Sequence, residues 1–358
     1  MLTRLTVENV RNLVPQSIDL GGAGLVVVTG ANAQGKTSLL EAAYLLATTR
    51  SFRTRDPREA IAVGEAHLRV EGALEGPDGP LPGLAMALGK ARGERVLSVG
   101  QFDAKLAEYL GLLPALPLAG DSIRQVAGSP SERRRFVDRA TAAADAAHLA
   151  DLSDYRRALN QRNEALRRGA GDRELDPWDD LLAGIGGKIA SRRRAQIAAW
   201  QAELASWPDL FPEGARAKLV YREAGRSKGG TLRERLERQR PLDRQTLRTS
   251  AGPHRDDLLI ELDGADLLKL GSAGQVRSAL AAVTAAQVRR VRLARTGRKP
   301  LLLLDDVDTD LDPRRLAALL EAAAAEAQVL AATSKAGLGV PAGALRLAVA
   351  AGKVAALD

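Results

Sequence analysis

The chain of 358 residues contains no cysteine. A disulfide framework, a thiol nucleophile and a cysteine zinc site are therefore excluded, and a reducing compartment is the simplest interpretation. Aromatic residues make up only 3% of the sequence, so the core must be built from Leu, Val and Ala. Such a core fits helices packed on a parallel sheet better than an aromatic-rich β-sandwich.

Long apolar runs are also missing. No stretch approaches the roughly twenty apolar residues of a membrane-spanning helix, and the segment from Met1 to Leu5 lacks the apolar region of a signal peptide. We therefore expect a cytoplasmic protein. The length and the 45% apolar content allow a large core and suggest about two domains.

A glycine-rich loop stands near the start of the chain. Residues 30–37 match the pattern GxxxxGK[ST] in full, after the apolar run 25–28 and before a helical run that begins at Ser38. In such a strand, loop and helix, backbone amides surround a polyphosphate, the lysine adds a cation and the Thr hydroxyl can ligate Mg²⁺. The residues predicted to contact nucleotide are Gly30, Ala31, Asn32, Ala33, Gln34, Gly35, Lys36, Thr37 and Ser38.

A second part of the same site is expected near the other end of the chain. The four leucines 301–304 are followed by Asp305 and Asp306, which is typical of a buried parallel strand that delivers acids at its C-terminal edge. Asp305 is predicted to hold Mg²⁺ with Thr37, and Asp306 to polarise the attacking water. The intervening chain must leave the ATPase fold and return.

Another glycine loop precedes the helical run 278–294. In ATP-binding-cassette ATPases a loop of this kind offers amides, a Ser hydroxyl and a helix dipole to nucleotide held by the other subunit. Ser272, Gly274 and Gln275 are the corresponding residues here, so the pattern implies a homodimer. The segment 308–312 has the place and form of the loop that crosses the dimer interface in these ATPases.

Most of the excess positive charge lies in the middle of the chain. Residues 129–250 carry 25 Lys and Arg against 18 Asp and Glu, whereas the rest of the chain carries 27 against 26. Such a surplus suggests a contact surface for the phosphates of DNA, although a merely solvated helical surface would look the same. The candidate DNA-binding residues are Arg133, Arg134, Arg135, Lys188, Arg192, Arg193 and Arg194.

The pattern of apolar residues predicts three segments. Residues 1–115 open with a strand and add a β meander over about 67–99, and residues 246–358 return to complete the same ATPase head. Residues 116–245 are rich in Ala, Arg, Leu and Glu at helical spacing and are predicted to form an inserted helical arm.

These motifs in this order resemble the head of the chromosome-maintenance and repair ATPases, and within them the RecF family. Four further segments carry the more specific resemblance, and it covers essentially the whole chain. They are Val10-Arg11-Asn12-Leu13, Arg50-Ser51-Phe52-Arg53-Thr54, Ser131-Glu132-Arg133-Arg134-Arg135-Phe136-Val137-Asp138 and Gly252-Pro253-His254-Arg255-Asp256-Asp257.

The resemblance implies an α/β fold: a P-loop ATP-binding-cassette head, with a Rossmann-like parallel sheet and an antiparallel β subdomain, and an inserted α-helical arm. It implies ATP and Mg²⁺ as cofactors, ATP-dependent dimerisation, slow hydrolysis that DNA stimulates, and binding to double-stranded, gapped or junction DNA in recombinational repair. RecR, with RecO, is the implied partner. Arg11 and Asn12 are expected near the nucleotide.

Two positions depart from the expected pattern. Thr333 stands where cassette transporters carry a switch histidine, so it is expected to replace that catalytic residue only in part. The segment 119–122 lacks the expected Pro-Glu-Asp form, and Gln125 is a poor substitute for a lid-loop glutamine. Both departures suggest slow turnover. The resemblance leaves open whether His254 and Arg255 are catalytic or structural.

Other functions remain alternatives at this point. A motor subunit of a transporter would need a surface that couples to a membrane protein, and the arginine-rich segment is a poor one. A structural clamp head of the SMC or cohesin type would need a far longer arm than the interval between residues 37 and 301 allows. In a third alternative, ATP would be only a structural ligand of an adaptor.

Overall fold

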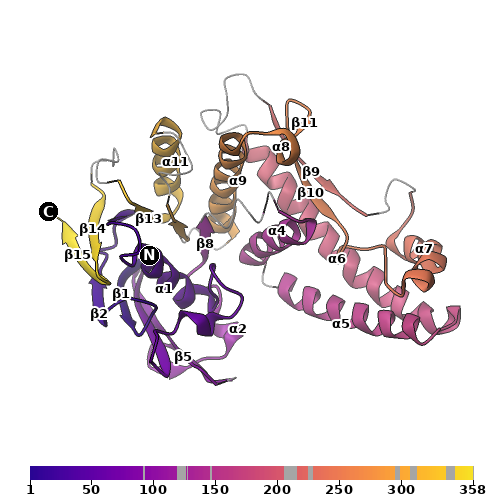
Figure 1. Cartoon of the computed structure of the whole chain (residues 1–358), viewed down its shortest axis with the longest axis horizontal. Helices are drawn as coiled ribbons and strands as arrows, with labels where there is room; N and C mark the ends of the chain where they lie inside the picture. Colours follow the sequence, from indigo (N-terminus) through magenta and orange to yellow (C-terminus); the bar gives the residue numbers. More distant parts are fainter. Residues whose placement is uncertain are drawn as a thin grey trace. The chain divides into compact units, whose positions relative to one another are not determined.

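The computed structural model describes residues 1–91, 93–118, 126, 128–145, 147–204, 216–224, 229–294, 299–306, 313–335 and 343–357 (Figure 1). The chain divides into two compact units. Unit 1 contains Met1–Ile123 and Arg277–Asp358, and unit 2 contains Arg124–Ser206 and Glu213–Val276. The return of the chain therefore differs from the predicted boundary at residue 246, because residues 246–276 belong to unit 2.

Unit 1 contains an antiparallel sheet with the strand order β2-β1-β4-β5-β6-β7. The predicted opening strand and the β meander are both found there, with small changes of bounds. Because β1, β2, β4, β5 and β6 each bury apolar side chains, this sheet contributes much of the core. The strands are β1 (Leu2–Glu8), β2 (Gln16–Asp19), β4 (His67–Gly76), β5 (Gly79–Gly89), β6 (Arg95–Val99) and β7 (Phe102–Asp103).

A second sheet of unit 1 has the order β15-β14-β3-β13-β12-β8 and is parallel except for β15. The carboxyl ends of β3, β13 and β12 meet at one edge, where open α/β sheets bind ligands. The strands are β3 (Leu25–Thr29), β8 (Ala115–Leu118), β12 (Leu301–Leu304), β13 (Gln328–Thr333), β14 (Leu345–Ala350) and β15 (Lys353–Leu357).

The helix that follows the glycine loop, α1 (Lys36–Thr48), lies between the two sheets. It packs on β4 and β5 of one sheet and on β8, β12 and β13 of the other. Its apolar residues are therefore buried all round rather than on one face. The other described helices with residues in unit 1 are η1 (Pro57–Ala60), α2 (Leu106–Tyr109), α9 (Ala273–Ala294), whose first turn lies in unit 2, and α11 (Pro313–Glu326).

One buried side chain joins the two sheets of unit 1. Gln328, at the start of β13, accepts a hydrogen bond from Leu2 N at 2.7 Å and donates to Leu2 O at 2.8 Å. It also donates to Ala23 O at 3.2 Å. Since a buried amide must be paired, Gln328 fixes the start of β1 against the start of β13.

In its described residues, unit 2 combines four long helices with a small sheet of order β11-β10-β9. Helices α5 and α6 run side by side, and α6 packs on β9 (Figure 1). The predicted arm is helical over most of its length, but β9 interrupts the helical pattern. The elements are α4 (Pro130–Ala144), α5 (Ala147–Arg167), α6 (Asp172–Leu204), β9 (Ala217–Arg222), α7 (Leu232–Thr246), β10 (Asp257–Leu262), β11 (Ala265–Asp266) and α8 (Leu267–Leu270).

The prediction that residues 246–358 return to the head is wrong for β10, which begins at the last residue of the Gly252–Asp257 motif and does not enter a sheet of unit 1. β10 pairs with β9 in antiparallel register from Asp257 opposite Arg222 to Leu262 opposite Ala217. The sequence favours a strand here but does not specify its partner. The backbone hydrogen bonds of β10 are satisfied inside unit 2, which is why this segment belongs to that unit.

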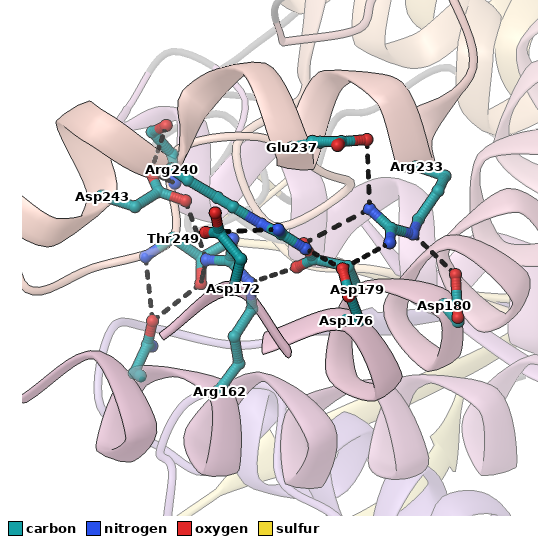
Figure 2. Close-up of polar contacts among 12 residues, drawn as sticks. Arg162, Asp172, Asp176, Asp179, Asp180, Arg233, Glu237, Arg240, Asp243 and Thr249 are labelled. Carbon is teal, nitrogen blue, oxygen red and sulfur yellow. Dashed lines mark hydrogen bonds and ion pairs between the residues drawn. The ribbon is translucent and has the colours of Figure 1, made fainter. Parts of the chain in front are cut away.

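A network of ion pairs fills the space between α5, α6 and α7. Arg162 of α5 lies among the carboxylates of Asp179 and Asp243, and Arg240 of α7 reaches Asp179 from the other side (Figure 2). Both arginines are at least nine-tenths buried. Unit 2 is thus held partly by internal charges, and its basic composition does not translate directly into a basic surface.

Among the helices that the structure describes, none is both long enough and apolar enough to cross a lipid bilayer.

Candidate nucleotide-binding site

The glycine loop between β3 and α1 has the backbone shape that the sequence predicted. Gly30, Ala33 and Gly35 have positive φ angles of 154°, 63° and 119°. A Cβ at Gly30 would lie 2.4 Å from the carbonyl oxygen of Val349, so only glycine fits there. The loop thus ends directly at the N-terminus of α1, where unpaired amides favour an anion.

The lysine of the loop folds back over the backbone. Lys36 is 4% exposed, and its ammonium group donates to Gly30 O at 2.8 Å and to Ala31 O at 3.0 Å. A cation is therefore held against the mouth of the loop before any phosphate arrives. Its flexible stem can move the same donors onto phosphate oxygens.

The two distant parts of the predicted site meet through one hydrogen bond. The hydroxyl of Thr37, in the first turn of α1, donates to Asp305 Oδ1 at 2.9 Å across 268 residues of sequence. Asp305 follows β12 directly, and its own amide donates to Leu118 O of β8 at 3.0 Å. One hydroxyl and one carboxylate thus converge at the carboxyl edge of the parallel sheet.

The same pair fits a magnesium ion. Burial raises the pKa of Asp305 to about 6, against the hydrogen bond from Thr37, which lowers it. A buried carboxylate without a full cationic partner is costly, and a divalent cation would remove that cost. Mg²⁺ is commonly bound by one or two protein oxygens together with substrate phosphates and water, which is the donor set that Thr37 and Asp305 offer.

The neighbouring acid has an unusual backbone. Asp306 is half-buried and has a φ of 49°, a left-handed conformation that Asp adopts more readily than most residues but still at some cost. Its predicted role with the attacking water stays a prediction.

Thr333 occupies the last position of β13, opposite Thr29 at the end of β3. It is fully buried, and its hydroxyl accepts a hydrogen bond from Lys335 N at 3.0 Å. The predicted catalytic hydroxyl therefore lies at the correct edge of the sheet but is engaged in a local turn.

Arg11 and Asn12 lie against the loop and its helix. Asn12 donates to Ala33 O at 3.1 Å and accepts from Ser38 Oγ at 2.8 Å, so it joins the loop to the first turn of α1. Arg11 forms two hydrogen bonds, of 2.9 and 3.0 Å, with the carboxylate of Glu41. Both residues were predicted near the nucleotide, and both hold protein groups around the site.

Glu41 was missed by sequence reasoning. This fully buried acid in the middle of α1 is bound by Arg11, by Ser51 Oγ at 2.5 Å and by Arg53 at 3.4 Å. The signal was a lone acid in an otherwise apolar run, because such an acid requires a cation. Arg53 is also close enough to Asp305 to lower the pKa of that carboxylate.

The second glycine loop forms a capped helix start. Gln275 N donates to Ser272 Oγ at 3.3 Å, and Ser272 N donates to the side chain of Gln275 at 2.9 Å, at the N-terminus of α9. This capping box leaves Ser272 exposed and Gly274 half-buried. The predicted interface loop 308–312, the segment 119–122 and Gln125 lie outside the residues that the structure describes.

Comparison with known proteins identifies the family. A family model described as an AAA domain matches residues 4–72. The DNA replication and repair protein RecF of Anaeromyxobacter dehalogenans (strain 2CP-C) is 36% identical over 329 residues, which is 88% of this chain and 87% of that protein. The chain belongs to the RecF family.

Solved structures agree with this assignment. The structure titled as the recombination mediator protein RecF-ATP in the RecFOR pathway matches with a TM-score of 0.87 at 27% identity, over 100% of this chain and 97% of that one. An SMC head bound to the C-terminal winged-helix domain of ScpA matches with a TM-score of 0.60 at 16% identity, over 100% of this chain and 98% of that one, which supports the fold alone. The predicted family and the predicted P-loop ATPase head are confirmed.

The arm arginines require a correction. Arg133 is 8% exposed and forms two hydrogen bonds, of 2.7 and 2.8 Å, with the carboxylate of Asp257. Arg193 is 3% exposed and is bound in the same way by Asp138 at 2.8 Å. These two predicted DNA-binding residues lie inside unit 2, because each neutralises an acid that the fold has buried.

Other members of the predicted set are also engaged. Arg134 is half-buried and donates to Asp256 O at 2.9 Å. Arg192 forms ion pairs with Asp145 and Asp151, and Arg194, although exposed, forms one with Glu223. Arg135 and Lys188 are exposed and remain the best candidates of that set for DNA phosphates.

Contacts within unit 2 hold both ring nitrogens of His254. Its Nε2 lies 2.9 Å from Thr249 O, which can only accept, so Nε2 carries the hydrogen and Nδ1 accepts from Tyr155 OH at 2.9 Å. A Cβ at the neighbouring Gly252 would lie 2.3 Å from that Tyr155 hydroxyl. The RecF-type segment 252–257 is thus a tightly packed joint in unit 2. Arg255, in contrast, is exposed.

The lowered pKa of His254 predicts that the stability of the folded chain depends on pH. Burial, with the charges of Arg255 and Arg134, lowers its pKa to about 4 from an ordinary value of 6.5. The unfolded state therefore binds the proton first as the pH falls, and stability is lost between about pH 6.5 and pH 4, by up to about 3 kcal/mol. Urea unfolding should show this loss in the wild-type chain and a loss smaller by that amount in His254→Gln.

The matched control for this prediction is His67→Gln. His67 is exposed on β4, so its replacement should leave the pH dependence of unfolding close to that of the wild-type chain. Equal pH slopes for His254→Gln and the wild-type chain would contradict the assignment of a buried neutral imidazole.

Proposed function

We propose that this chain is an ATP-dependent DNA-binding protein of DNA replication and recombinational repair, and that ATP joins two copies of it. One observation carries the proposal: the 2.9 Å contact of Thr37 with Asp305, which unites the phosphate loop with the acidic strand end. Membership of the RecF family supports the same conclusion.

Each residue of the site has a proposed task in this function. Lys36 and the amides of residues 30–37 bind the triphosphate, while Thr37 and Asp305 hold Mg²⁺, which when bound would neutralise phosphate charge. Asp306 orients water for slow hydrolysis, and Thr333, a buried hydroxyl in place of a histidine, supports that water only weakly. The site therefore favours slow hydrolysis, which would act as a timer by setting how long the ATP dimer lasts, over the fast hydrolysis of a motor.

Dimerisation is proposed to use the start of α9. Ser272 is exposed, and the helix behind it presents its positive end there. In a dimer this end would bind the terminal phosphate of nucleotide held by the other copy, so ATP and ADP would differ in their affinity for the closed state. Gly274 lets the backbone approach closely, and Gln275 holds the Ser272 turn.

Binding to duplex, gapped or junction DNA is proposed through exposed cations of unit 2, with Arg135 and Lys188 as first candidates. Contacts of this kind go to phosphates, so they carry affinity without a sequence code. RecR, with RecO, is the proposed protein partner, on the strength of the family and of the RecFOR pathway named for the related structure.

Sedimentation velocity with ATP, ADP or no nucleotide, each with and without duplex DNA, tests the proposal. We expect monomers without nucleotide, dimers with ATP, and faster ATP hydrolysis when DNA is present. A monomer under all conditions would contradict the dimer. ATP hydrolysis that does not respond to DNA, in a chain that does not bind DNA, would favour a transport motor.

Asp306→Asn tests the timer. The amide cannot take a proton from water, so hydrolysis should slow by about 100-fold or more while ATP still binds, and the ATP dimer should live correspondingly longer. Light scattering after ATP removal measures the dimer lifetime, and phosphate release measures hydrolysis. Asp78→Asn, in an exposed turn between β4 and β5, is the control; an unchanged dimer lifetime in Asp306→Asn would refute the timer.

A further inference from the structure

The turn between β14 and β15 is aimed at the phosphate loop. Ala351 and Gly352 form a two-residue hairpin turn with φ angles of 47° and 78°, which is the arrangement of a type I′ turn. Ala351 N donates to the side-chain oxygen of Gln34 at 2.6 Å, and Gly352 N donates to Gln34 O at 2.9 Å. Both amides of the turn thus bind one residue of the loop.

The opposite side of the turn binds the segment after β1. Gly352 O accepts from Gln16 Nε2 at 2.7 Å and from Val14 N at 3.2 Å. Gln16 in turn accepts from Val354 N of β15 at 2.8 Å. A Cβ at Gly352 would lie 2.0 Å from Asn12 O, so the turn packs on this segment at the closest approach that glycine allows.

Asn12 links this segment back to the phosphate loop. Its amide group joins Ala33 O to Ser38 Oγ, the two sides of the loop where α1 begins. The phosphate loop, the hairpin turn and the segment 12–16 therefore hold one another in a closed ring of hydrogen bonds. β14 also packs closely against the phosphate loop, because a Cβ at Gly30 would lie 2.4 Å from Val349 O.

We propose that the β14–β15 hairpin turn is a positioning element for the phosphate loop, with Gly352 and Gln16 as its positioning residues. The inference rests on the proposed function, in which this loop binds ATP. A loop whose amides are already directed loses less freedom on binding than a mobile one. The affinity for ATP should therefore depend on residues that contact no phosphate.

Gly352→Ala is the first test. The added Cβ must push the turn away from Asn12 O, and the displacement reaches Gln34 through both turn amides. We expect the Kd for a fluorescent ATP analogue to rise about tenfold. Gly64→Ala is the matched control, because Gly64 has a φ of 92° in unit 1 and open space around a new Cβ, so it imposes backbone strain alone.

Gln16→Ala is the second test, with Ser17→Ala as its control. Gln16 loses its bonds to Gly352 O and Val354 N, whereas the adjacent Ser17 loses only its 3.0 Å bond with Thr6 Oγ1. We expect weaker ATP binding in Gln16→Ala, with a melting temperature without nucleotide equal to that of Ser17→Ala. The KM for ATP should rise while kcat stays near its wild-type value.

Three outcomes would overturn the inference. They are unchanged ATP affinity in both Gly352→Ala and Gln16→Ala, an equal loss of affinity in Gly64→Ala, and a fall in affinity that only follows the melting temperature. A wild-type chain that binds no ATP would instead refute the proposed function, so the two failures can be distinguished.

Discussion

Lys36→Ala is expected to lose most of its affinity for ATP. The ammonium group is buried and held by two loop carbonyls, at 2.8 and 3.0 Å, where phosphate oxygens would replace them. Removing a buried, charge-assisted partner of phosphate costs about 3 kcal/mol, or on the order of 100-fold in Kd. Because the proposed dimer requires bound ATP, sedimentation with ATP should then show only monomers.

Titration with a fluorescent ATP analogue measures this loss, and the melting temperature without nucleotide shows that the variant is folded. Lys90→Ala removes an exposed lysine of unit 1 and should bind ATP like the wild-type chain. If Lys36→Ala retained wild-type affinity, the loop of residues 30–37 would not be the nucleotide site.

The second large effect concerns the buried ion network of unit 2. Arg162 is fully buried and binds Asp179 at 2.6 Å, Asp243 at 2.7 Å and Thr249 Oγ1 at 2.9 Å (Figure 2). Removing one partner of a buried pair leaves uncompensated charge, so Arg162→Ala should lower the free energy of unfolding by about 3–5 kcal/mol. Asp179 keeps Arg240 at 2.6 Å, whereas Asp243 loses its bound cation.

Urea unfolding followed by tryptophan fluorescence tests this prediction, because Trp178 and Trp200 both lie on α6. The control is Arg167→Ala on α5, the helix that carries Arg162. It breaks an exposed 2.9 Å pair with Glu164 and should change stability by no more than about 0.5 kcal/mol.

The double variant Arg162→Met with Asp243→Asn should be more stable than Arg162→Met alone, since it also removes the stranded charge. A loss in Arg162→Ala no larger than in Arg167→Ala would contradict the network's role.

The local motifs of this chain could be predicted because their information is local. A strand, a loop with glycines at set positions, and a helix lie within residues 25–48, and their backbone requirements appear directly as residue types. The placement of Asp305 beside Thr37 followed from a general rule, since parallel strands deliver their carboxyl ends to one edge of a sheet. The family resemblance ordered these pieces correctly.

Charge was harder to interpret. The arginines of residues 129–250 looked alike in sequence, yet Arg133 binds Asp257, which is 124 residues away, and Arg193 binds Asp138 across 55 residues. Counting charges gives the net excess but does not say which cations are already neutralised. The same limitation hid the cations that bind Glu41.

Consecutive residues are enough to specify the phosphate loop, the acidic strand end and the inserted basic segment of this chain. Tertiary contacts, in contrast, decide which arginines are buried, that His254 is a neutral packing residue, and that a hairpin near the C-terminus holds Gln34. These outcomes depend on partners brought together from distant parts of the chain, and burial and charge pairing arise only once those partners meet.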